Sequence, residues 1–296
     1  METVGVIGLG RIGLRVADNL IKSGYRVVGY RRHAMTEFVS LGGKAADSPA
    51  EVGAAADIVF SCLPSAEALD EVFQGPHGLM HSARPGQILV ELGSYSLPVK
   101  ERQIVPLAAK GAVFIDGEVA GTPGMVSERK AVVFLAGDRD ACIKAERVVA
   151  GFADSCFYFG AFGAATKVKL VNNLLVAVHI AATAEAMAIG LKAGVDVDLM
   201  IKAIAGGSGA STQFRIRAPW MVERRFLPAQ GTASALWHYL ETVDAFAASA
   251  GVATPMRDRA AELFKSCIDM GLGEHDVAIM IDVLSGLPTR GPVAAC

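Results

Sequence analysis

The sequence predicts an α/β protein in which a doubly wound parallel sheet is followed by an all-α domain. Short β-branched runs alternate with helical segments up to about residue 150, and only helical segments follow Gly194. Between them, the stretch from Ala164 to Gly194 is rich in Ala, Leu and Met and contains no proline. It predicts one long interdomain helix, since about 28 residues would span roughly 42 Å. We therefore expect two domains, at residues 1–163 and 164–296.

Composition and charge are those of a globular protein. The 296 residues are 52% hydrophobic and 20% charged, which is enough to bury a sizeable core. A net charge of −2 without a charged tail implies neither a nucleic acid nor a membrane surface as partner. Five scattered cysteines without a C-x-x-C motif predict no disulfide framework and no metal site. Together with an N-terminus unlike a signal peptide, they favour a cytoplasmic location.

The long apolar stretch raises the question of a membrane span. A span needs roughly 18–20 apolar residues with almost no charge. Here polar side chains interrupt the stretch at Asn172, Asn173, His179 and Glu185. We therefore expect a buried helix of a soluble protein, and we interpret His179 and Glu185 as interior or interface groups rather than catalytic ones.

The N-terminal segment carries a glycine motif in the context of a dinucleotide site. Residues 3–7 predict a strand, residues 8–13 read G-L-G-R-I-G, a helix follows to about residue 23, and residues 25–30 predict a second strand. In this Rossmann arrangement Gly8 makes the turn, Gly10 lets the backbone approach a pyrophosphate, and Gly13 lets the helix pack on the strand. The alternative is a glycine-rich turn without a ligand.

The end of the second strand predicts which cofactor binds. An NAD site usually places an Asp or Glu about 20 residues after the motif, on the ribose 2′-hydroxyl. This chain has Tyr30, Arg31 and Arg32 there and no acid. Two guanidiniums can bind a 2′-phosphate, so we predict NADP(H). The alternative is a solvated basic turn, with Tyr30 either stacking on adenine or capping the strand.

The alternation continues to about residue 150. We expect strands at residues 57–61, 87–91, 113–116 and 131–136, and helices at 48–55, 66–73, 98–110 and 141–150. The ligand should lie beyond the carboxyl ends of the strands, where Pro64 and Ser94 fall. Residues 116–129 predict a glycine-bearing loop that either offers N–H groups to an anion or only connects two elements.

The remaining helices are expected at residues 197–205, 211–224, 233–250, 254–270 and 275–284, with a frayed tail from Pro288. On the long helix, spacings of three and four residues place Asn172 and Asn173 on the same face as Lys169.

These stretches together resemble the β-hydroxyacid dehydrogenase family, which includes 3-hydroxyisobutyrate dehydrogenase and tartronate semialdehyde reductase. The resemblance runs from Val4 to about Leu284. The opening motif is similar to G-L-G-x-M-G-x-x-M-A-x-N-L, and Tyr30-Arg31-Arg32 stands where NADPH-using members have Asn-Arg-Thr. Leu63-Pro64 matches an L-P turn, and Ser94 stands at the Thr of D-M-S-T. Residues 163–173 resemble G-x-G-x-x-x-K-x-x-N-N, except for Ala165 at the second Gly.

The resemblance implies roles for individual residues. Lys169 is the implied catalytic lysine, and Asn173 is the implied second catalytic residue. The implied cofactor contacts are Gly8, Leu9, Gly10, Arg11, Ile12, Gly13, Tyr30, Arg31, Arg32, Leu63, Pro64, Leu69 and Ser94. The implied substrate contacts are Ala120, Gly121, Thr122, Asn172 and Trp237. The family also implies a homodimer or homotetramer.

Two departures from the family pattern concern the substrate. The family loop D-x-P-V-S-G-G reads D-G-E-V-A-G-T here, so Ala120 lacks the serine hydroxyl that usually meets a carboxylate, and Thr122 replaces a glycine. On a late helix, Leu240 and Glu241 stand where the family has Lys-Asp. The nearby aromatic residues, Trp237 among them, indicate either a more apolar pocket or ordinary helix packing.

Three functions remain open at this point. The first is an NADP(H)-dependent reductase or dehydrogenase of hydroxyacids or semialdehydes, with Lys169 as general acid and base. Burial and the positive charge of oxidised nicotinamide would lower the pKa of that lysine from about 10.4. The second is an imine reductase, a class that shares this architecture but generally lacks the lysine. The third is an NADPH-binding scaffold without catalysis.

Overall fold

The computed structural model describes residues 1–286, and the expected frayed tail lies outside them. The chain divides into unit 1, Met1–Lys169, and unit 2, which begins at Leu170. The long helix α9 (Ala164–Lys192) begins at the expected domain boundary, but its first residues pack with unit 1. Thr166 accounts for this, because its N–H and its hydroxyl both donate hydrogen bonds to Asp116.

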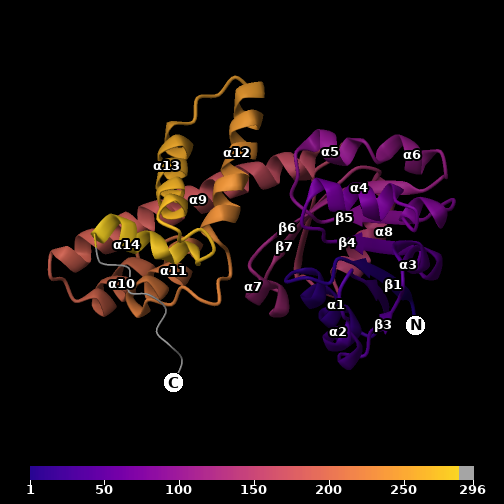
Figure 1. Cartoon of the computed structure of the whole chain (residues 1–296), viewed down its shortest axis with the longest axis horizontal. Coiled ribbons are helices and arrows are strands. Elements are labelled where there is room, and N and C mark those ends of the chain that lie inside the picture. Colours follow the sequence, from indigo (N-terminus) through magenta and orange to yellow (C-terminus); the bar gives the residue numbers. More distant parts are fainter. Residues whose placement is uncertain (287–296) are drawn as a thin grey trace. The chain divides into compact units, whose positions relative to one another are not determined.

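Among residues 1–286, unit 1 forms one eight-stranded sheet in the order β3-β2-β1-β4-β5-β6-β7-β8 (Figure 1). The strands are β1 (Thr3–Ile7), β2 (Arg26–Tyr30), β3 (Lys44–Ala45), β4 (Ile58–Ser61), β5 (Ile88–Glu91), β6 (Val113–Ala120), β7 (Val132–Ala136) and β8 (Ser155–Tyr158). The expected doubly wound α/β class is confirmed. One pair departs from a fully parallel sheet, since β7 runs antiparallel to β6.

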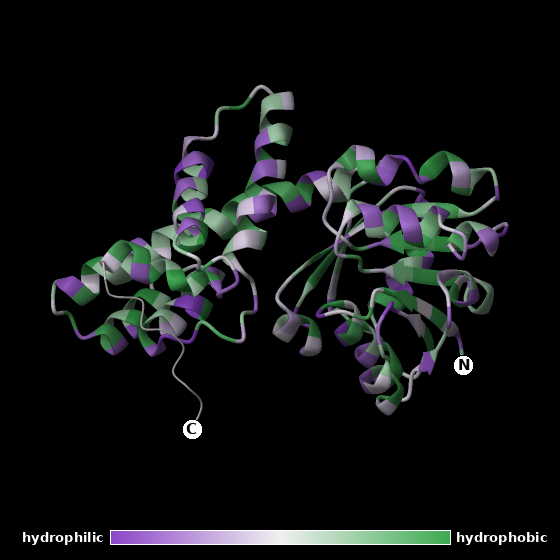
Figure 2. Cartoon of the chain, in the orientation of Figure 1, coloured by the Kyte–Doolittle hydropathy of each residue, from purple (hydrophilic) through white to green (hydrophobic). Residues whose placement is uncertain are grey.

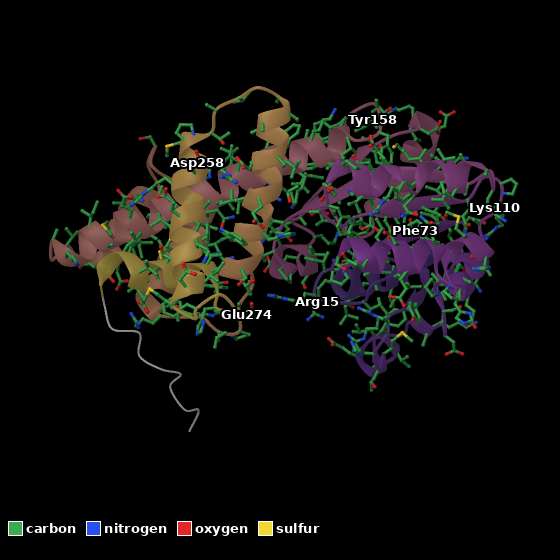
Figure 3. All side chains as sticks on the ribbon, turned by 45° about the horizontal axis from the view of Figure 1, so that its top comes forward. Arg15, Phe73, Lys110, Tyr158, Asp258 and Glu274 are labelled. Atoms are coloured by element: carbon green, nitrogen blue, oxygen red, sulfur yellow. The ribbon has the colours of Figure 1, made fainter. Side chains whose placement is uncertain are left out.

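Helices cover both faces of this sheet because strand side chains alternate between them. The helices of unit 1 are α1 (Gly13–Lys22), α2 (Thr36–Ser40), α3 (Pro49–Ala55), α4 (Ala66–Gln74), α5 (Leu97–Glu101), α6 (Ile104–Ala108), α7 (Pro123–Ser127) and α8 (Arg139–Val149). Val4 and Phe60 pack with α1 and α8 on one face. Val59 and Leu89 pack with α3, α4 and α6 on the other, where Phe73 lies inside the unit and Lys110 at its surface (Figure 3).

Two local predictions for unit 1 were wrong in detail. Residues 117–120 continue strand β6 instead of starting a loop, because they pair with β7, and the short helix α7 follows. The expected helix at 98–110 is two short helices, α5 and α6. Pro106 explains the break, since it has no N–H to donate to the carbonyl of Arg102.

Unit 2 is all-helical, as expected. Its helices after α9 are α10 (Val197–Ala205), α11 (Thr212–Glu223), α12 (Ala233–Ser249), α13 (Pro255–Asp269) and α14 (Met280–Ser285), with a short 3₁₀ turn, η2, at Val277–Ile279. Figure 2 shows apolar stretches on α9 and α11, and their side chains pack into one core that includes Met187, Phe214 and Phe264. This core also contains a buried ion pair, in which Arg217 Nη1 lies 2.8 Å from each carboxylate oxygen of Asp276.

Within residues 1–286, α9 is the single helix long and apolar enough to meet the composition criteria for a membrane span. The expectation that Asn172, Asn173, His179 and Glu185 interrupt every such window was wrong, because α9 contains an 18-residue window that is apolar on average. The most apolar window is 44% buried within the chain. Ala177, Ala184 and Met187 of α9 belong to the core of unit 2, and a core helix passes the same test.

Candidate functional site

The loop after β1 lies where the strand order reverses between β1 and β4. Gly8 N–H donates to Tyr30 O (2.9 Å), and Cys62 N–H donates to Ile7 O (2.8 Å), so the ends of β1, β2 and β4 meet here. Gly8 has φ +87°, and a Cβ atom on it would lie 2.2 Å from Cys62 O. The turn therefore requires glycine, and it directs the following residues toward the carboxyl edge of the sheet.

The same loop fits the pyrophosphate of a dinucleotide. A Cβ atom on Gly10 would meet no atom within 4 Å, so this backbone is open on the outer side. A Cβ atom on Gly13, by contrast, would lie 2.2 Å from Gly8 O. Only glycine at position 13 therefore lets α1 begin this close to the loop. The N-terminus of α1 has no side-chain cap and no acidic residue in its first turn. An uncapped N-terminus beside an open glycine favours an anion.

The basic residues expected to select the cofactor occupy the end of β2. Arg31 donates from Nη1 to Leu9 O (3.1 Å) and from Nε to Ala34 O (2.8 Å), which holds its guanidinium beside the glycine loop. The exposed Arg32 reaches Glu71 at 3.7 Å.

The other predicted cofactor residues lie at neighbouring strand ends or in the core. Leu63 and Pro64 follow β4, and Leu63 O accepts from the Tyr95 hydroxyl at 2.6 Å. Ser94 follows β5. Leu69 is fully buried on α4 among apolar side chains, so its side chain is a packing group in this structure. Leu9 is likewise buried, while Arg11 and Ile12 lie on the loop itself.

Lys169 lies near the start of α9, half-buried, with its ammonium on unit 1. Its Nζ donates to the carbonyl of Val119, near the end of β6, at 2.6 Å. Burial lowers the pKa of Lys169 below its ordinary value, the Glu118 carboxylate opposes this change, and the Lys100 ammonium adds to it. A lysine whose pKa is lowered can exchange a proton nearer to neutral pH.

Two groups that act on Lys169, Glu118 and Lys100, belong to a buried ionic cluster that the sequence analysis did not predict. Lys100 and Glu118 are both fully buried, and Lys100 Nζ lies 2.9 Å from Glu118 Oε1 and 3.0 Å from Asp116 Oδ1. Ser94 Oγ donates to Glu118 Oε2 at 2.6 Å, which links a predicted cofactor residue to the cluster. Burial alone would lower the pKa of Lys100, but the carboxylates of Glu118, Asp116 and Glu91 together raise it.

Glu91, at the end of β5, is the third carboxylate of this region and is also fully buried. It accepts hydrogen bonds from the Ser61 hydroxyl and from Gly93 N–H, the latter at 2.6 Å. Burial raises its pKa from 4.5 to about 7, although Lys100 and both hydrogen bonds oppose the rise. Glu91 therefore changes charge near neutral pH.

The signal that could have revealed the cluster is the alternation of acids along β6. Asp116 and Glu118 are two residues apart on a strand, so their side chains lie on one face of the sheet. Two acids on the buried face of a strand require cationic partners. Lys100 is 16 residues before Asp116 in the sequence, but nothing local to it predicts burial.

The predicted substrate residues of unit 1 follow β6. Ala120 is half-buried at the strand end, and Gly121 is exposed. Thr122 has a local structural role, because its hydroxyl caps α7 by accepting from Met125 N–H at 3.3 Å. Thr122, which stands where the family has glycine, thus stabilises the N-terminus of α7 as its capping residue.

The predicted residues of unit 2 lie on α9 and α12. Asn173 follows Lys169 by one helical turn, is 5% exposed, and its Nδ2 has no hydrogen-bond partner. Asn172 and Trp237 are half-buried, and Trp237 packs against the unit 2 core. Leu240, at the family's lysine position, is fully buried in that core. Among residues 1–286, no group of three or more His, Cys, Asp or Glu could hold a metal ion.

Two family models match the two halves of the chain. Residues 3–160 match the NAD binding domain of 6-phosphogluconate dehydrogenase. Residues 163–284 match the model described as NAD-binding of NADP-dependent 3-hydroxyisobutyrate dehydrogenase. The two matches meet just before α9 begins.

Individual relatives agree with these matches. The chain is 30% identical over 303 residues to an L-threonate dehydrogenase from Cupriavidus necator, covering 98% of each chain. A solved 3-hydroxyisobutyrate dehydrogenase from Salmonella typhimurium superposes with a TM-score of 0.87 at 24% identity, covering 96% of this chain and 100% of the other. An imine reductase from Myxococcus stipitatus, solved with NADP+, gives a TM-score of 0.64 at 18% identity, covering 94% of this chain and 98% of the other. At these identities the two solved structures show the fold alone.

Proposed function

Because the chain belongs to the 3-hydroxyisobutyrate dehydrogenase family, within the β-hydroxyacid dehydrogenases, we propose that it is an NADP(H)-dependent oxidoreductase with Lys169 as its general acid and base. The proposed substrate is a small hydroxyacid or the corresponding semialdehyde. The observation that carries the proposal is the half-buried Lys169 ammonium on the Val119 carbonyl, in a setting that lowers its pKa.

The chain's own residues have distinct roles in this proposal. The nicotinamide, when bound, supplies or accepts the hydride. Lys169 donates a proton to the substrate oxygen during carbonyl reduction and removes it during alcohol oxidation. The glycine loop and the N-terminus of α1 hold the pyrophosphate, and Arg31 pairs with the 2′-phosphate. Asn173, one turn beyond Lys169 on α9, orients the lysine or the substrate, and its unpartnered amide nitrogen can donate a hydrogen bond to a substrate oxygen.

An imine reductase remains the second candidate. The fold similarity to an imine reductase supports it, and so does Ala120, which leaves no serine hydroxyl for a substrate carboxylate. Lys169 counts against an imine reductase, because that class generally lacks the lysine that the β-hydroxyacid dehydrogenases use. A scaffold without catalysis is the third candidate, and the same experiment distinguishes all three.

The first test is NADPH oxidation, with NADH as the control, across semialdehyde acids, uncharged aldehydes and cyclic imines. We expect turnover of a semialdehyde acid that Lys169→Ala reduces by at least about 100-fold, since general acid catalysis contributes about that much or more. Cofactor affinity should remain, because Lys169 is not one of the predicted cofactor contacts. Lys167→Ala is the matched control, since Lys167 is exposed on the same helix turn.

Each other outcome removes one candidate. Turnover only of cyclic imines would exclude the hydroxyacid assignment. Tight NADPH binding with no turnover of any substrate would favour the scaffold. Full activity in Lys169→Ala would contradict the proposed role of the lysine whatever the substrate.

A further inference from the structure

Glu118 binds Ser94, a predicted cofactor residue, and directly precedes the residue whose carbonyl holds Lys169. It is fully buried on β6, where Ser94 and Lys100 bind its two oxygens at 2.6 and 2.9 Å. The next residue on the strand, Val119, holds the Lys169 ammonium through its carbonyl. Glu118 therefore joins Ser94 and Lys100 directly, and the residue after it on β6 holds Lys169.

Glu118 is the acid whose charge compensates that of Lys169. Two groups act on the lysine directly: the Glu118 carboxylate attracts its proton, and the Lys100 ammonium on α5 repels it. Asp116 on β6 and Glu91 on β5 act on Lys100, and Asp116 is also bound by Thr166 of α9. Without the charge of Glu118, the repulsion of the Lys169 ammonium by the buried Lys100 ammonium would not be compensated.

Glu118 is suited to this role as an ionised group. Burial raises its pKa, while Lys100, Lys169 and Ser94 oppose that rise. Both of its oxygens accept hydrogen bonds, which is the arrangement of a carboxylate rather than of a carboxylic acid. The family pattern has proline at this position, so the group is a feature of this chain's own sequence.

We propose that Glu118, held by Lys100, is a positioning residue that sets the protonation of the Lys169 amine and thereby the pH range in which the enzyme works. This inference rests on the proposed function for its catalytic meaning. The electrostatic effect on the amine exists without any substrate, so it can be measured separately.

The test follows the amine itself in the full-length protein. Competitive acylation with trace acetic anhydride across a pH series, read by peptide mass spectrometry, gives the titration midpoint of Lys169, because only the neutral amine reacts. Glu118→Gln keeps the shape and removes the charge, so the midpoint should move to lower pH. Half a unit corresponds to roughly threefold faster labelling on the acid side. Lys100→Gln removes the repelling ammonium and should move the midpoint to higher pH.

Internal controls are present in the chain. Exposed Lys167 reports on the reagent and should not change. Buried Lys100 becomes labelled only when unit 1 opens, so its labelling in Glu118→Gln reports loss of the fold. Glu101→Gln neutralises an exposed acid beside Lys100 and should leave the midpoint in place. Glu118→Asp keeps the charge and should keep the midpoint closer to that of the wild type than Glu118→Gln does.

The outcomes separate this inference from the proposed function. An unchanged midpoint in a folded Glu118→Gln, or shifts of the same sign in Glu118→Gln and Lys100→Gln, would overturn it. If Glu118→Gln opens unit 1, the sign of the Lys100→Gln shift decides. Once a substrate is known, the alkaline limb of carbonyl reduction should move to lower pH in Glu118→Gln. Full turnover in Lys169→Ala would end the catalytic role but leave the labelling result standing.

Discussion

Three glycines in the loop after β1 meet different constraints. Gly8 needs a positive φ and lies against Cys62 O, and Gly13 lies against Gly8 O. Gly10 has open space where a side chain would be. The structure thus assigns Gly8 and Gly13 to the fold and leaves Gly10 facing outward.

Gly10→Ala should therefore separate ligand binding from stability. The free energy of unfolding should stay the same or rise by up to about 1 kcal/mol, since alanine restricts the unfolded chain. NADPH affinity should fall by about tenfold or more, because the methyl group occupies the approach of the pyrophosphate. Calorimetric titration and chemical denaturation measure the two effects. Gly13→Ala is the contrast and should lose stability; unaltered NADPH affinity in Gly10→Ala would contradict the assigned loop.

Arg31→Asp tests the 2′-phosphate assignment. Loss of charge-assisted hydrogen bonds should weaken NADPH binding by roughly 10- to 100-fold relative to NADH. Fluorescence titration with each cofactor gives the ratio. Arg26→Asp makes the same change of charge at the other, exposed end of β2 and should leave the ratio unchanged. An unchanged ratio in Arg31→Asp would make the basic turn a solvated surface feature.

At the level of elements, Asp276 joins several segments of unit 2. It lies before η2 and accepts from Arg217 of α11 and from the N–H groups of Gln230 and Ala278 at 2.9 and 3.1 Å. One carboxylate thus fixes a helix, a loop and a turn together. Arg217 is 3% exposed, so it has no solvent to replace that partner.

Asp276→Ala should lower the free energy of unfolding of unit 2 by about 3–5 kcal/mol, because it leaves the Arg217 charge buried and unpaired. Urea denaturation followed by tryptophan fluorescence measures it, since both tryptophans, Trp220 and Trp237, lie in unit 2. Glu274→Ala, exposed two residues earlier (Figure 3), should stay within about 0.5 kcal/mol of wild type. A loss below about 1 kcal/mol in Asp276→Ala would mean that the pair contributes little.

The elements that could be predicted from the sequence are those determined by the residues within and next to them. The strand Thr3–Ile7 and the helices Val197–Ala205 and Ala233–Ser249 follow from β-branched runs and from capping residues such as Asp196 and Thr232. The missed elements depend on partners distant in sequence. Residues 117–120 are strand because β7 pairs with them, and β8 is a four-residue edge strand whose side chains show no buried alternation.

The same distinction applies to the site. The glycine loop, Arg31 and Lys169 could be located because each belongs to a motif of fixed spacing. The pairing of Lys100 with Glu118 could not, because it depends on where the folded unit places Lys100 of α5 relative to β6. Whether the located residues act as proposed stays a prediction for the experiments above.

For the molecule as a whole, Glu91 predicts how stability depends on pH. Its pKa is raised from 4.5 to about 7 in the folded state, so the folded chain keeps a proton that the unfolded chain releases. This contribution is fully present below about pH 4.5 and is lost as the pH rises through about 7.

Glu91→Gln should remove that dependence. Relative to wild type, its free energy of unfolding should increase by about 2–3 kcal/mol between pH 5 and pH 8. The readout must come from unit 1, where no tryptophan lies, so hydrogen exchange of the β5 amides is suitable. Glu101→Gln, exposed nearby, should show no such change. A constant difference between Glu91→Gln and wild type across this range would contradict the raised pKa.

The full burial of Lys100 also restricts how this sequence can diverge. A chain with proline at position 118 would leave a lysine at position 100 with less compensation, and a chain without Lys100 would leave Glu118 without its cation. The two positions must therefore change together, so descendants of this protein should carry both charges or neither. Covariation of these two alignment columns would be the evolutionary trace of one buried ion pair.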